Sequence, residues 1–508
     1  MTWWRTMLLS LVCCGASWGL LPGEVAVVYN ANSPLSCKAM QHYCRLRGIK
    51  PHQCIPLQDV AAGEISRGDF DIKIRMALLL AGRERGLNWP CGPAHGSQTM
   101  RAMVLMPDLP LRIKEEIGLN GKHPGQVPNN AASVDSELML LGAEYPRDKF
   151  GRNAFFRANQ TLESARPRVM SVCRIDAPTE EAVFRMMNDA VKVERMGLHG
   201  WVVVDQGGPY PEGDKWMDGV AKQARQAHRP LFHETSRHTL AEAFPLMRDT
   251  AVYVGWYANP PNGPFRKTAP AEFKFAPGAI AFHLHSYSAT GIKTADSWVG
   301  ALLQRGAAVT AGNVAEPMLG TCLYYDVFYE RLQAGYTVAE AALMATPVVS
   351  WQGIVLGDPL YRPYARRVRP LRGDVYAEWQ EACRRMAGDD ARLCSLVESK
   401  LSAPRGALWA ELYAWFCANR NESARAAAYF AAAAERYGLE SDIIRTRLLE
   451  ATCLFAVGHK TRSESILRGL ATRYESSPYA PAIRQSLNTL FPPPPPPKPQ
   501  QNQQTPTK

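Results

Sequence analysis

The sequence predicts an α/β fold with a mainly parallel sheet flanked by helices, followed by an all-α helical-repeat region. Two observations carry this prediction. Apolar runs of strand length alternate with helical patterns between residues 24 and about 370, as in parallel β-α-β units. Beyond residue 372 the strand-like runs stop, and helical patterns continue to about residue 490.

The first elements are marked by capping residues as well as by pattern. Residues 24–30 form an apolar run typical of a buried strand. Ser33 and Pro34 predict a helix start, and Gly48 predicts its end. Further helices are expected at 72–80 and 180–196. Further strands are expected at 54–57, 103–107, 168–175, 201–206, 251–257, 279–285 and 307–312. These elements fit one elaborated domain or two closely packed α/β halves.

Chemistry is expected where polar residues follow the predicted strands, because ligands of parallel sheets bind beyond the carboxyl ends of the strands. The segment 279–363 contains most of these residues. They are His283, His285, Ser286, Asn313, Glu316 and Asp358.

Several parts of this segment resemble gingipain-like, caspase-type cysteine peptidases. The counterparts of a helix, a strand and a closing turn of that family are 297–303, 306–309 and the residues Gly357, Asp358, Pro359, Leu360 and Arg362. The resemblance implies a caspase-type fold in which a catalytic Cys and His end two neighbouring strands.

The sequence departs from that family at both catalytic positions. The strand expected to end in Cys ends in His285 and Ser286. The strand expected to end in His ends in Trp256 and Tyr257. The resemblance therefore implies the fold without the thiol chemistry.

The sequence is also similar to a family of exported bacterial proteins. The shared blocks occur in one order, and the resemblance spans about residues 24–368. They lie at 110–113, 132–138, 174–178, 210–214, 255–258, 283–289, 312–317 and 357–363. This resemblance implies export but no particular reaction.

Two kinds of chemistry are candidates at the end of the 279–285 strand. His285 or His283 could activate Ser286 for peptidase-like hydrolysis, with Asp358 orienting the base. A turn would be needed there, because adjacent strand residues point to opposite faces. Alternatively, His283 and His285 lie two residues apart and could together bind a metal, although the sequence requires none. Asp135, Glu137, Asp205 and Glu316 are candidates for a third ligand.

Other candidate residues suggest substrate binding. Ser133 should cap a helix that carries Asp135 and Glu137 in its first turn. Asp205 follows a predicted strand, and Trp256 and Tyr257 could stack on a substrate or simply fill the core. Asn313 and Glu316 complete the predicted binding set.

The first residues resemble a signal peptide. A basic residue precedes an apolar run that is short for a membrane span, and small residues follow, so residues 1–19 are expected to be removed on export. Cys13 and Cys14 suggest a lipoprotein less strongly. The expected location is the periplasm or the medium.

Ten cysteines remain after that segment, in a compartment that permits disulfides. Cys383 could pair with Cys394, and Cys37, Cys44 and Cys54 could form one local bridge; buried free thiols are the alternative. The net charge of +11 comes from scattered residues, and the sequence contains no Walker-type loop. Nucleic acid is therefore not an expected partner.

The region 374–490 contains two similar segments with a period of 37 to 39 residues, in which Phe416 corresponds to Phe455. This spacing predicts paired helices of the tetratricopeptide kind, either as a peptide-binding groove or as a structural cap. Residues 491–508 begin with six consecutive prolines after Phe491 and favour a polyproline II rod followed by a disordered end.

Two functions follow from these patterns. The first is an exported hydrolase acting on peptides through a non-thiol site on the α/β domain, residues 20–373. The second is a non-catalytic scaffold that binds a peptide, protein or glycan of the cell envelope. Clustering of the candidate residues around one open pocket would favour the first, and their mutual pairing would favour the second.

Overall fold

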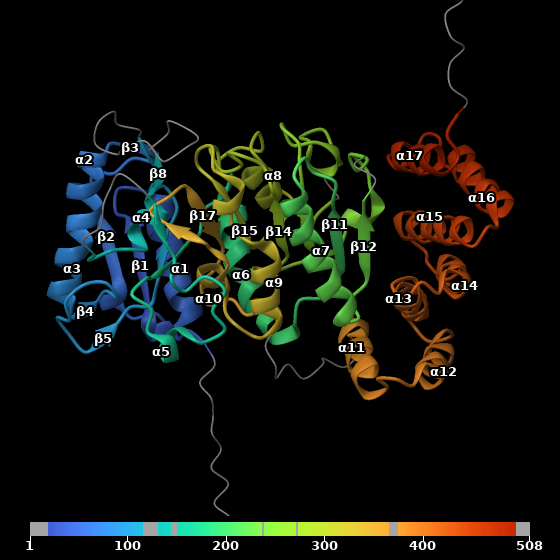
Figure 1. Ribbon diagram of the computed structural model, residues 1–508, viewed down its shortest axis with the longest axis horizontal. Helices are drawn as coiled ribbons and strands as arrows, with labels where there is room; N and C mark the ends of the chain where they lie inside the picture. Colours follow the sequence, from blue (N-terminus) through green and yellow to red (C-terminus); the bar gives the residue numbers. More distant parts are fainter. Residues whose placement is uncertain are drawn as a thin grey trace, which may run out of the picture.

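The computed structural model describes residues 19–114, 131–143, 150–235, 238–270, 273–364 and 374–493. The expected signal segment and most of the proline-rich end lie outside these residues. The described residues form an α/β region built on two sheets and a separate column of helices (Figure 1). The predicted fold class is confirmed.

The first sheet has six strands in the order β15-β17-β10-β6-β1-β2. Strands β2, β1, β6 and β10 pair in parallel, and β15 and β17 pair antiparallel. Their bounds are β1 (Val25–Asn30), β2 (Cys54–Leu57), β6 (Ala102–Leu105), β10 (Ser171–Arg174), β15 (Thr310–Asn313) and β17 (Gly353–Leu356).

The second sheet has four parallel strands in the order β12-β11-β13-β14. Their bounds are β11 (Trp201–Asp205), β12 (Leu231–Glu234), β13 (Thr250–Gly255) and β14 (Ile280–His283). A single parallel bridge between Ile280 and Val309 joins β14 to the residue before β15. The two sheets therefore continue into one another.

Helices cover the sheets where the sequence predicts them. Helix α1 starts after Ser33, whose side chain accepts from the Ser36 amide, and ends at Gly48 in the left-handed conformation. The larger helices are α1 (Pro34–Arg47), α3 (Ala77–Arg85), α6 (Glu180–Met196), α7 (Pro211–Gln226), α8 (Trp298–Gln304), α9 (Tyr325–Gln333) and α10 (Val338–Ala345). The short helices are α2 (Arg67–Asp69), the π-helical η3 (Phe70–Met76), α4 (Val134–Leu138) and α5 (Leu162–Ala165). Short strands are β3 (Gly63–Ile65), β4 (Leu87–Asn88), β5 (Gln98–Thr99), β7 (Pro110–Ile113), β8 (Ala132–Ser133), β9 (Gly151–Arg152) and β16 (Val348–Val349).

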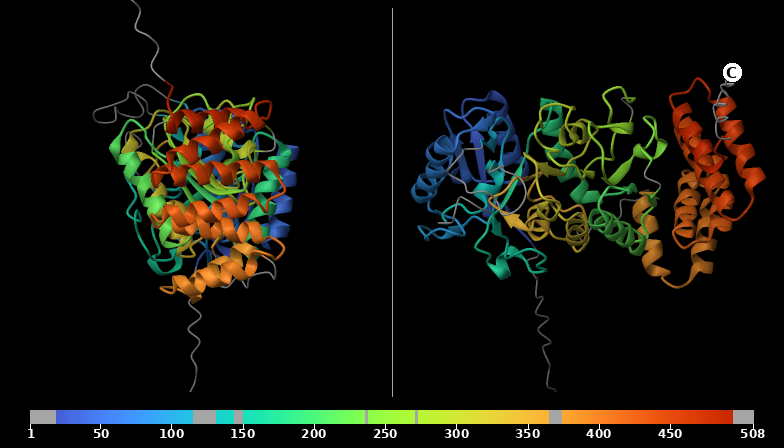
Figure 2. Two further views of the ribbon diagram at one scale, coloured as in Figure 1. Left: turned by 90° about the vertical axis from the view of Figure 1, so that its right-hand side faces the viewer. Right: turned by 45° about the horizontal axis from the view of Figure 1, so that its top comes forward.

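The C-terminal helices form successive antiparallel hairpins. They are α11 (Val375–Arg385), α12 (Asp390–Lys400), α13 (Gly406–Ala418), α14 (Ser423–Ala434), α15 (Glu440–Ala456), α16 (Lys460–Arg473) and α17 (Ala480–Leu490). The repeat is visible in Figure 2, where these helices stand as a wall beside the second sheet. Phe416 and Phe455 lie near the ends of α13 and α15, as the period predicts.

The inner helices of this wall pack on one face of the second sheet. Trp201 of β11 lies 6.3 Å from Trp415 of α13 between ring centroids, and the Arg445 guanidinium of α15 lies 4.9 Å above the Trp201 ring. Val202 and Val204 face the opposite core, with α7 and α9. The alternation of one strand thus separates two hydrophobic cores, one of which is shared with the helical region.

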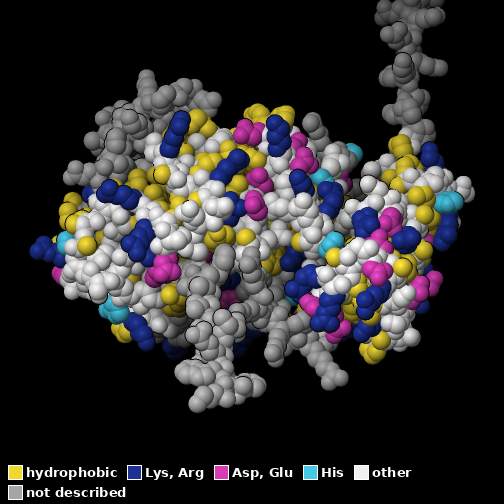
Figure 3. Space-filling view, turned by 60° about the horizontal axis from the view of Figure 1, so that its bottom comes forward, with side chains coloured by type: hydrophobic (Ala, Val, Ile, Leu, Met, Phe, Trp, Pro, Cys, Tyr) yellow, Lys and Arg dark blue, Asp and Glu magenta, His cyan; other side chains and the backbone are white. Residues whose placement is uncertain are grey.

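Charged side chains of both signs are interspersed on the face shown in Figure 3. On the helical region they form neighbouring pairs such as Arg468 with Glu464. In the part of the chain that the structure describes, no helix is long and apolar enough to cross a bilayer.

All ten cysteines of the described residues are free thiols. Cys383 is buried, whereas the Cys394 thiol lies 3.2 Å from the Tyr429 hydroxyl, so the expected pairing of these two cysteines is not formed. The thiols of Cys44 and Cys54 lie 3.3 Å apart.

Candidate functional site

The carboxyl ends of β11, β13 and β14 form the edge at which the sequence places its candidate residues. Strand β12 lies on one side of β11, and β13 lies on the other. The connection after β11 leads to β12, and the next connection crosses back to β13, so a topological switch point lies between β11 and β13. Ligands of parallel sheets bind at such points. The loops after these strands therefore define the first surface to consider.

A buried hydrogen-bonded row crosses the three strands. Asp205, Gly255 and His283 are in register on adjacent strands. The hydroxyl of Tyr253 lies 3.3 Å from Asp205 Oδ2 and 3.2 Å from His283 Nδ1. A Cβ at Gly255 would lie 2.3 Å from the Tyr253 hydroxyl, so glycine is required there.

Two members of this row, Tyr253 and His283, are closed to ligands. Tyr253 is fully buried and His283 is 3% exposed, with its ring stacked on Trp298 at 3.3 Å between centroids. Burial lowers the pKa of His283 well below its usual value, which keeps the imidazole neutral. Burial and the nearby Glu234 raise the pKa of Asp205 to about 7. His283 is thus an interior group, whereas Asp205 is partly exposed.

Trp256 fills the crevice at the switch point. Its indole occupies the space beside Gly208 and Gly213, where an added Cβ would come within 1.8 Å and 2.3 Å of the ring. Its Nε1 donates to Asp214 Oδ1 at 2.8 Å, and the Gly207 and Gly208 amides donate to the same oxygen. The loop amides that could have bound an anion are therefore satisfied internally.

Five aromatic rings form a continuous row on the loops of this edge, which we call the aromatic strip. Its members in order are Tyr210, Trp256, Tyr257, His285 and Tyr287. Successive ring centroids are 6.4, 6.4, 5.1 and 5.4 Å apart. Tyr210, Tyr257 and Tyr287 are 57%, 47% and 43% exposed, whereas Trp256 and His285 are 5% and 6% exposed. Exposed and buried rings therefore alternate along the strip.

Ser286 and His285 are not arranged as a nucleophile and base. The Ser286 hydroxyl lies 3.4 Å from the Tyr257 hydroxyl, and within the described ranges no hydrogen bond joins it to His285. The His285 ring instead contacts the rings of Tyr257 and Tyr287, and burial lowers its pKa. Strand β14 ends at His283, so the two histidines contact different neighbours.

Asp358 lies at the opposite edge of the sheet and does not orient His285. Its Oδ1 accepts from Tyr43 at 2.8 Å, and its Oδ2 accepts from Arg47 Nε at 2.6 Å. The chain around it passes the start of β14, where Tyr361 donates to the Gly278 carbonyl. Residues 280–285 span about 16 Å of extended chain, which separates Asp358 from the end of β14. The predicted Ser-His-Asp combination is wrong on this point.

Two further candidate carboxylates, Asp135 and Glu137, are paired inside the first half of the chain. Ser133 caps α4 as predicted. Asp135 forms two hydrogen bonds with Arg174, at 3.2 and 2.6 Å, and Glu137 pairs with Arg67 at 3.1 Å. These charges are buried, so each is held by its partner rather than presented to a ligand.

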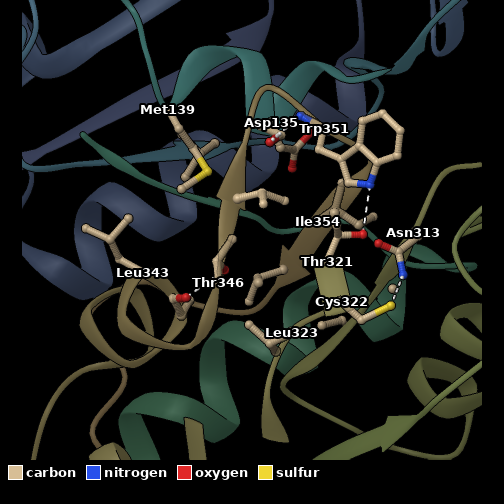
Figure 4. Close-up of a pocket in the computed structure, with 18 of the residues that line it drawn as sticks. Asp135, Met139, Asn313, Thr321, Cys322, Leu323, Leu343, Thr346, Trp351 and Ile354 are labelled. Atoms are coloured by element: carbon tan, nitrogen blue, oxygen red, sulfur yellow. Dashed lines mark hydrogen bonds between the residues drawn. The ribbon is translucent and has the colours of Figure 1, made fainter. Parts of the chain in front are cut away.

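Asp135 and Asn313 both line a small cavity between α4, β15 and β17 (Figure 4). Asn313 donates to the Cys322 thiol, and Trp351 donates to Thr321. The volume of this cavity, about 40 Å³, suits a few water molecules rather than a substrate. Glu316 is partly buried in the loop after β15.

The described residues contain no group of three or more His, Cys, Asp or Glu side chains arranged to hold a metal. His283 Nδ1 faces the Tyr253 hydroxyl, and three of the carboxylates expected as third ligands, Asp135, Glu137 and Asp205, have the partners given above. The structure thus gives the two histidines no shared metal site.

A cleft of about 1030 Å³ lies at the amino edge of the second sheet, against the helical region. None of the residues predicted from the sequence lines it. Its carboxylates have partners: Asp442 accepts from Arg445, and Asp374 caps α11 and lies 3.8 Å from His199.

The sequence prediction located the strip through Trp256, Tyr257 and His285 but missed Tyr210 and Tyr287. The second of these is signalled by the loop sequence 286–291, which is rich in Ser, Tyr and Gly. Tyr253 was hidden within an apolar strand.

Comparisons with known proteins leave this site without an assigned activity. No protein-family model matches the sequence, and no curated protein matches it. A solved structure described as that of a protease is similar at 12% sequence identity and a TM-score of 0.38. The similarity covers 67% of this chain and 78% of that chain. So weak a likeness carries no argument about function, and the chemistry of the site must be argued from its own residues.

Proposed function

We propose that this protein is a binding module that recognises extended peptides through the aromatic strip. The alternation of exposed and buried rings along the strip carries the proposal. Tyr210, Tyr257 and Tyr287 offer exposed faces, and the buried rings of Trp256 and His285 between them restrict their movement. Rigid tyrosines provide large contact areas at low cost in conformational entropy.

The polar groups of the strip suit a peptide better than a glycan. The Tyr257 and Ser286 hydroxyls, which are 3.4 Å apart, can donate to peptide carbonyls. A sugar would need several acceptors for its hydroxyls, and Oδ1 of the nearby Asp214 already accepts from Trp256 and two loop amides. Peptide is therefore the proposed ligand class.

Hydrolysis has less support. Ser286 has a tyrosine hydroxyl as its neighbour rather than an imidazole, and Asp358 is bonded to Arg47 at the other edge. Asp135, Glu137 and Asp358 are each paired with an arginine, which is the arrangement expected of a scaffold. We propose, from the sequence of the first residues, that the protein acts after export, on a partner in the cell envelope.

The test measures binding of the full chain to a displayed library of random extended peptides and to a glycan array. Tyr257→Ala and Tyr287→Ala should each weaken binding of selected peptides by at least about tenfold, as expected of tyrosine hot spots. Both side chains are exposed, so the melting temperature should change little.

Ile72→Ser is the matched control, because Ile72 is 72% exposed on the helical segment far from the strip. It should leave peptide binding unchanged. Selection of glycans instead of peptides, or equal binding by the tyrosine variants and the control, would refute the proposal. Cleavage of selected peptides that is lost in Ser286→Ala would restore the hydrolase hypothesis.

A further inference from the structure

The chain carries a segment with the composition that aromatic surfaces of this kind bind. Residues 492–497 are six prolines, followed by Lys498 and Pro499. Such a run favours the polyproline II helix, which is already ordered and therefore loses little entropy on binding. Aromatic-lined surfaces are the usual receptors of such helices.

The end of α17 brings this segment to the edge of the sheet that carries the strip. Thr489 and Leu490 of α17 line one pocket together with Glu234, at the end of β12, and Leu240. The Gln485 side chain donates to the Thr239 carbonyl at 2.6 Å. In Figure 1, α17 lies level with the loops above the second sheet.

The loop that follows Tyr257 also contacts Thr239. Asn262, five residues beyond Tyr257, donates to the Thr239 hydroxyl at 3.3 Å. Phe491, which follows α17, packs edge-on against Phe455 at 5.3 Å. The proline run therefore begins next to the elements that support the strip.

The dimensions are compatible. The six prolines, residues 492–497, extend about 19 Å at about 3.1 Å per residue, or two turns. One turn of a polyproline II helix is about 9 Å, and two steps along the strip, at 5.1 to 6.4 Å each, can cover that distance. Alternate rings are the exposed tyrosines, so one ring can meet each turn. Glu212, exposed two residues beyond Tyr210, offers a carboxylate for Lys498.

We infer that the proline run of this chain docks on its own aromatic strip and competes there with external ligands. This inference rests on the proposed function, because it requires the strip to bind peptides. It narrows the ligand class to proline-rich peptides. A partner peptide must then displace the proline run, so only ligands that bind better, or that are present in excess, gain access.

The test uses a fluorescent synthetic copy of residues 491–508 as probe and measures its anisotropy with three proteins of full length. The first is the unaltered chain. The second has residues 492–497 replaced by alternating Gly and Ser, which keeps the length and removes the rod. The third adds Tyr257→Ala to the second. Thermal unfolding of all three verifies that they are folded.

The second protein should bind the probe at least about tenfold more tightly than the first, and the third should lose this binding. Equal affinity of the first and second proteins would overturn docking of the proline run. So would a concentration-dependent dimer of the unaltered chain, because the run would then occupy the strip of a second copy.

The two proposals fail separately. If the second protein does not bind the probe but does bind library peptides through Tyr257, the strip is a peptide site and the inference about the proline run is wrong. If it binds neither, both proposals fall.

Discussion

The carboxylate of Asp358 holds the guanidinium of Arg47, which lies 311 residues earlier in the chain. Arg47 is also bonded to Glu194 through Nη1 at 2.7 Å, so one buried cation connects α1, α6 and the turn after β17. This network lies at the edge of the sheet opposite the aromatic strip, and its function is therefore structural.

Asp358→Asn should destabilise the protein by about 3 to 5 kcal/mol, because it removes one partner of a buried ion pair. The free energy of unfolding in urea measures the loss. Arg47→Met combined with Asp358→Asn should cost less than the sum of the single changes, since the pair acts as a unit. Peptide binding to the strip should be unchanged at temperatures where the variants are folded. Loss of binding without loss of stability would contradict a structural role.

The contribution of Asp205 to stability should decrease as the pH rises from about 4 to 7. The pKa of Asp205 is about 7 in the folded chain and about 3.9 in an unfolded one. Between these values the folded state binds the extra proton, so raising the pH favours unfolding, and the effect levels off above pH 7. Urea midpoints at pH 5 and pH 8 measure this difference.

Asp205→Asn should reduce this pH dependence, because an amide can still accept from Tyr253 without becoming charged. Asp249→Asn should have a separate effect in the same direction, because burial also raises the pKa of that carboxyl, away from the row. An unchanged difference in Asp205→Asn would show that Asp205 does not titrate in this range.

Oxidation should join Cys44 to Cys54. Their thiols are 3.3 Å apart, so little movement is needed. With glutathione disulfide as oxidant, the two thiols lose two protons and two electrons, and two glutathione molecules are formed. Peptide mapping should find this bridge, and the short loop should add about 2 to 3 kcal/mol of stability. Cys54→Ser should abolish both effects, while Cys383→Ser should not; a bridge elsewhere would contradict the expectation.

The helical cap and the α/β region should unfold together. Trp415 of α13 packs against Trp201 of β11, so Trp415→Ala should cost about 3 to 5 kcal/mol. Far-UV circular dichroism and pulse proteolysis should both detect a single unfolding transition, which in Trp415→Ala should move to lower denaturant concentration. Leu439→Ala, at an exposed position, should shift it little. Separate unfolding of the helices at lower denaturant would show that the cap is independent.

The sequence predicts best those features that are determined locally. Ser33, Gly48 and Ser133 cap their helices as expected, since a cap depends on residues within one turn. Strand-length apolar runs gave the main strands because burial on both faces leaves a continuous pattern. Strands β12 and β17 were missed.

The candidate site depends on long-range pairing, which one sequence does not reveal. Asp358 follows a strand like a catalytic residue, but its hydrogen bonds go to Tyr43 and Arg47 on a helix near the start of the chain. Asp135 and Glu137 are likewise neutralised by distant arginines. An aromatic side chain can bind a ligand only if it is exposed to solvent. Its exposure depends on how distant parts of the chain pack around it.

The helices packed beside the second sheet limit how many repeat units this protein can gain or lose in evolution. Solenoids usually gain and lose units freely, because each unit touches only its neighbours. Here α11, α13 and α15 each rest on the sheet, so deleting one unit would uncover part of the sheet, and an added unit would extend beyond its edge. The number of units is therefore matched to the height of the sheet, and variation in length is expected at the free end after α17.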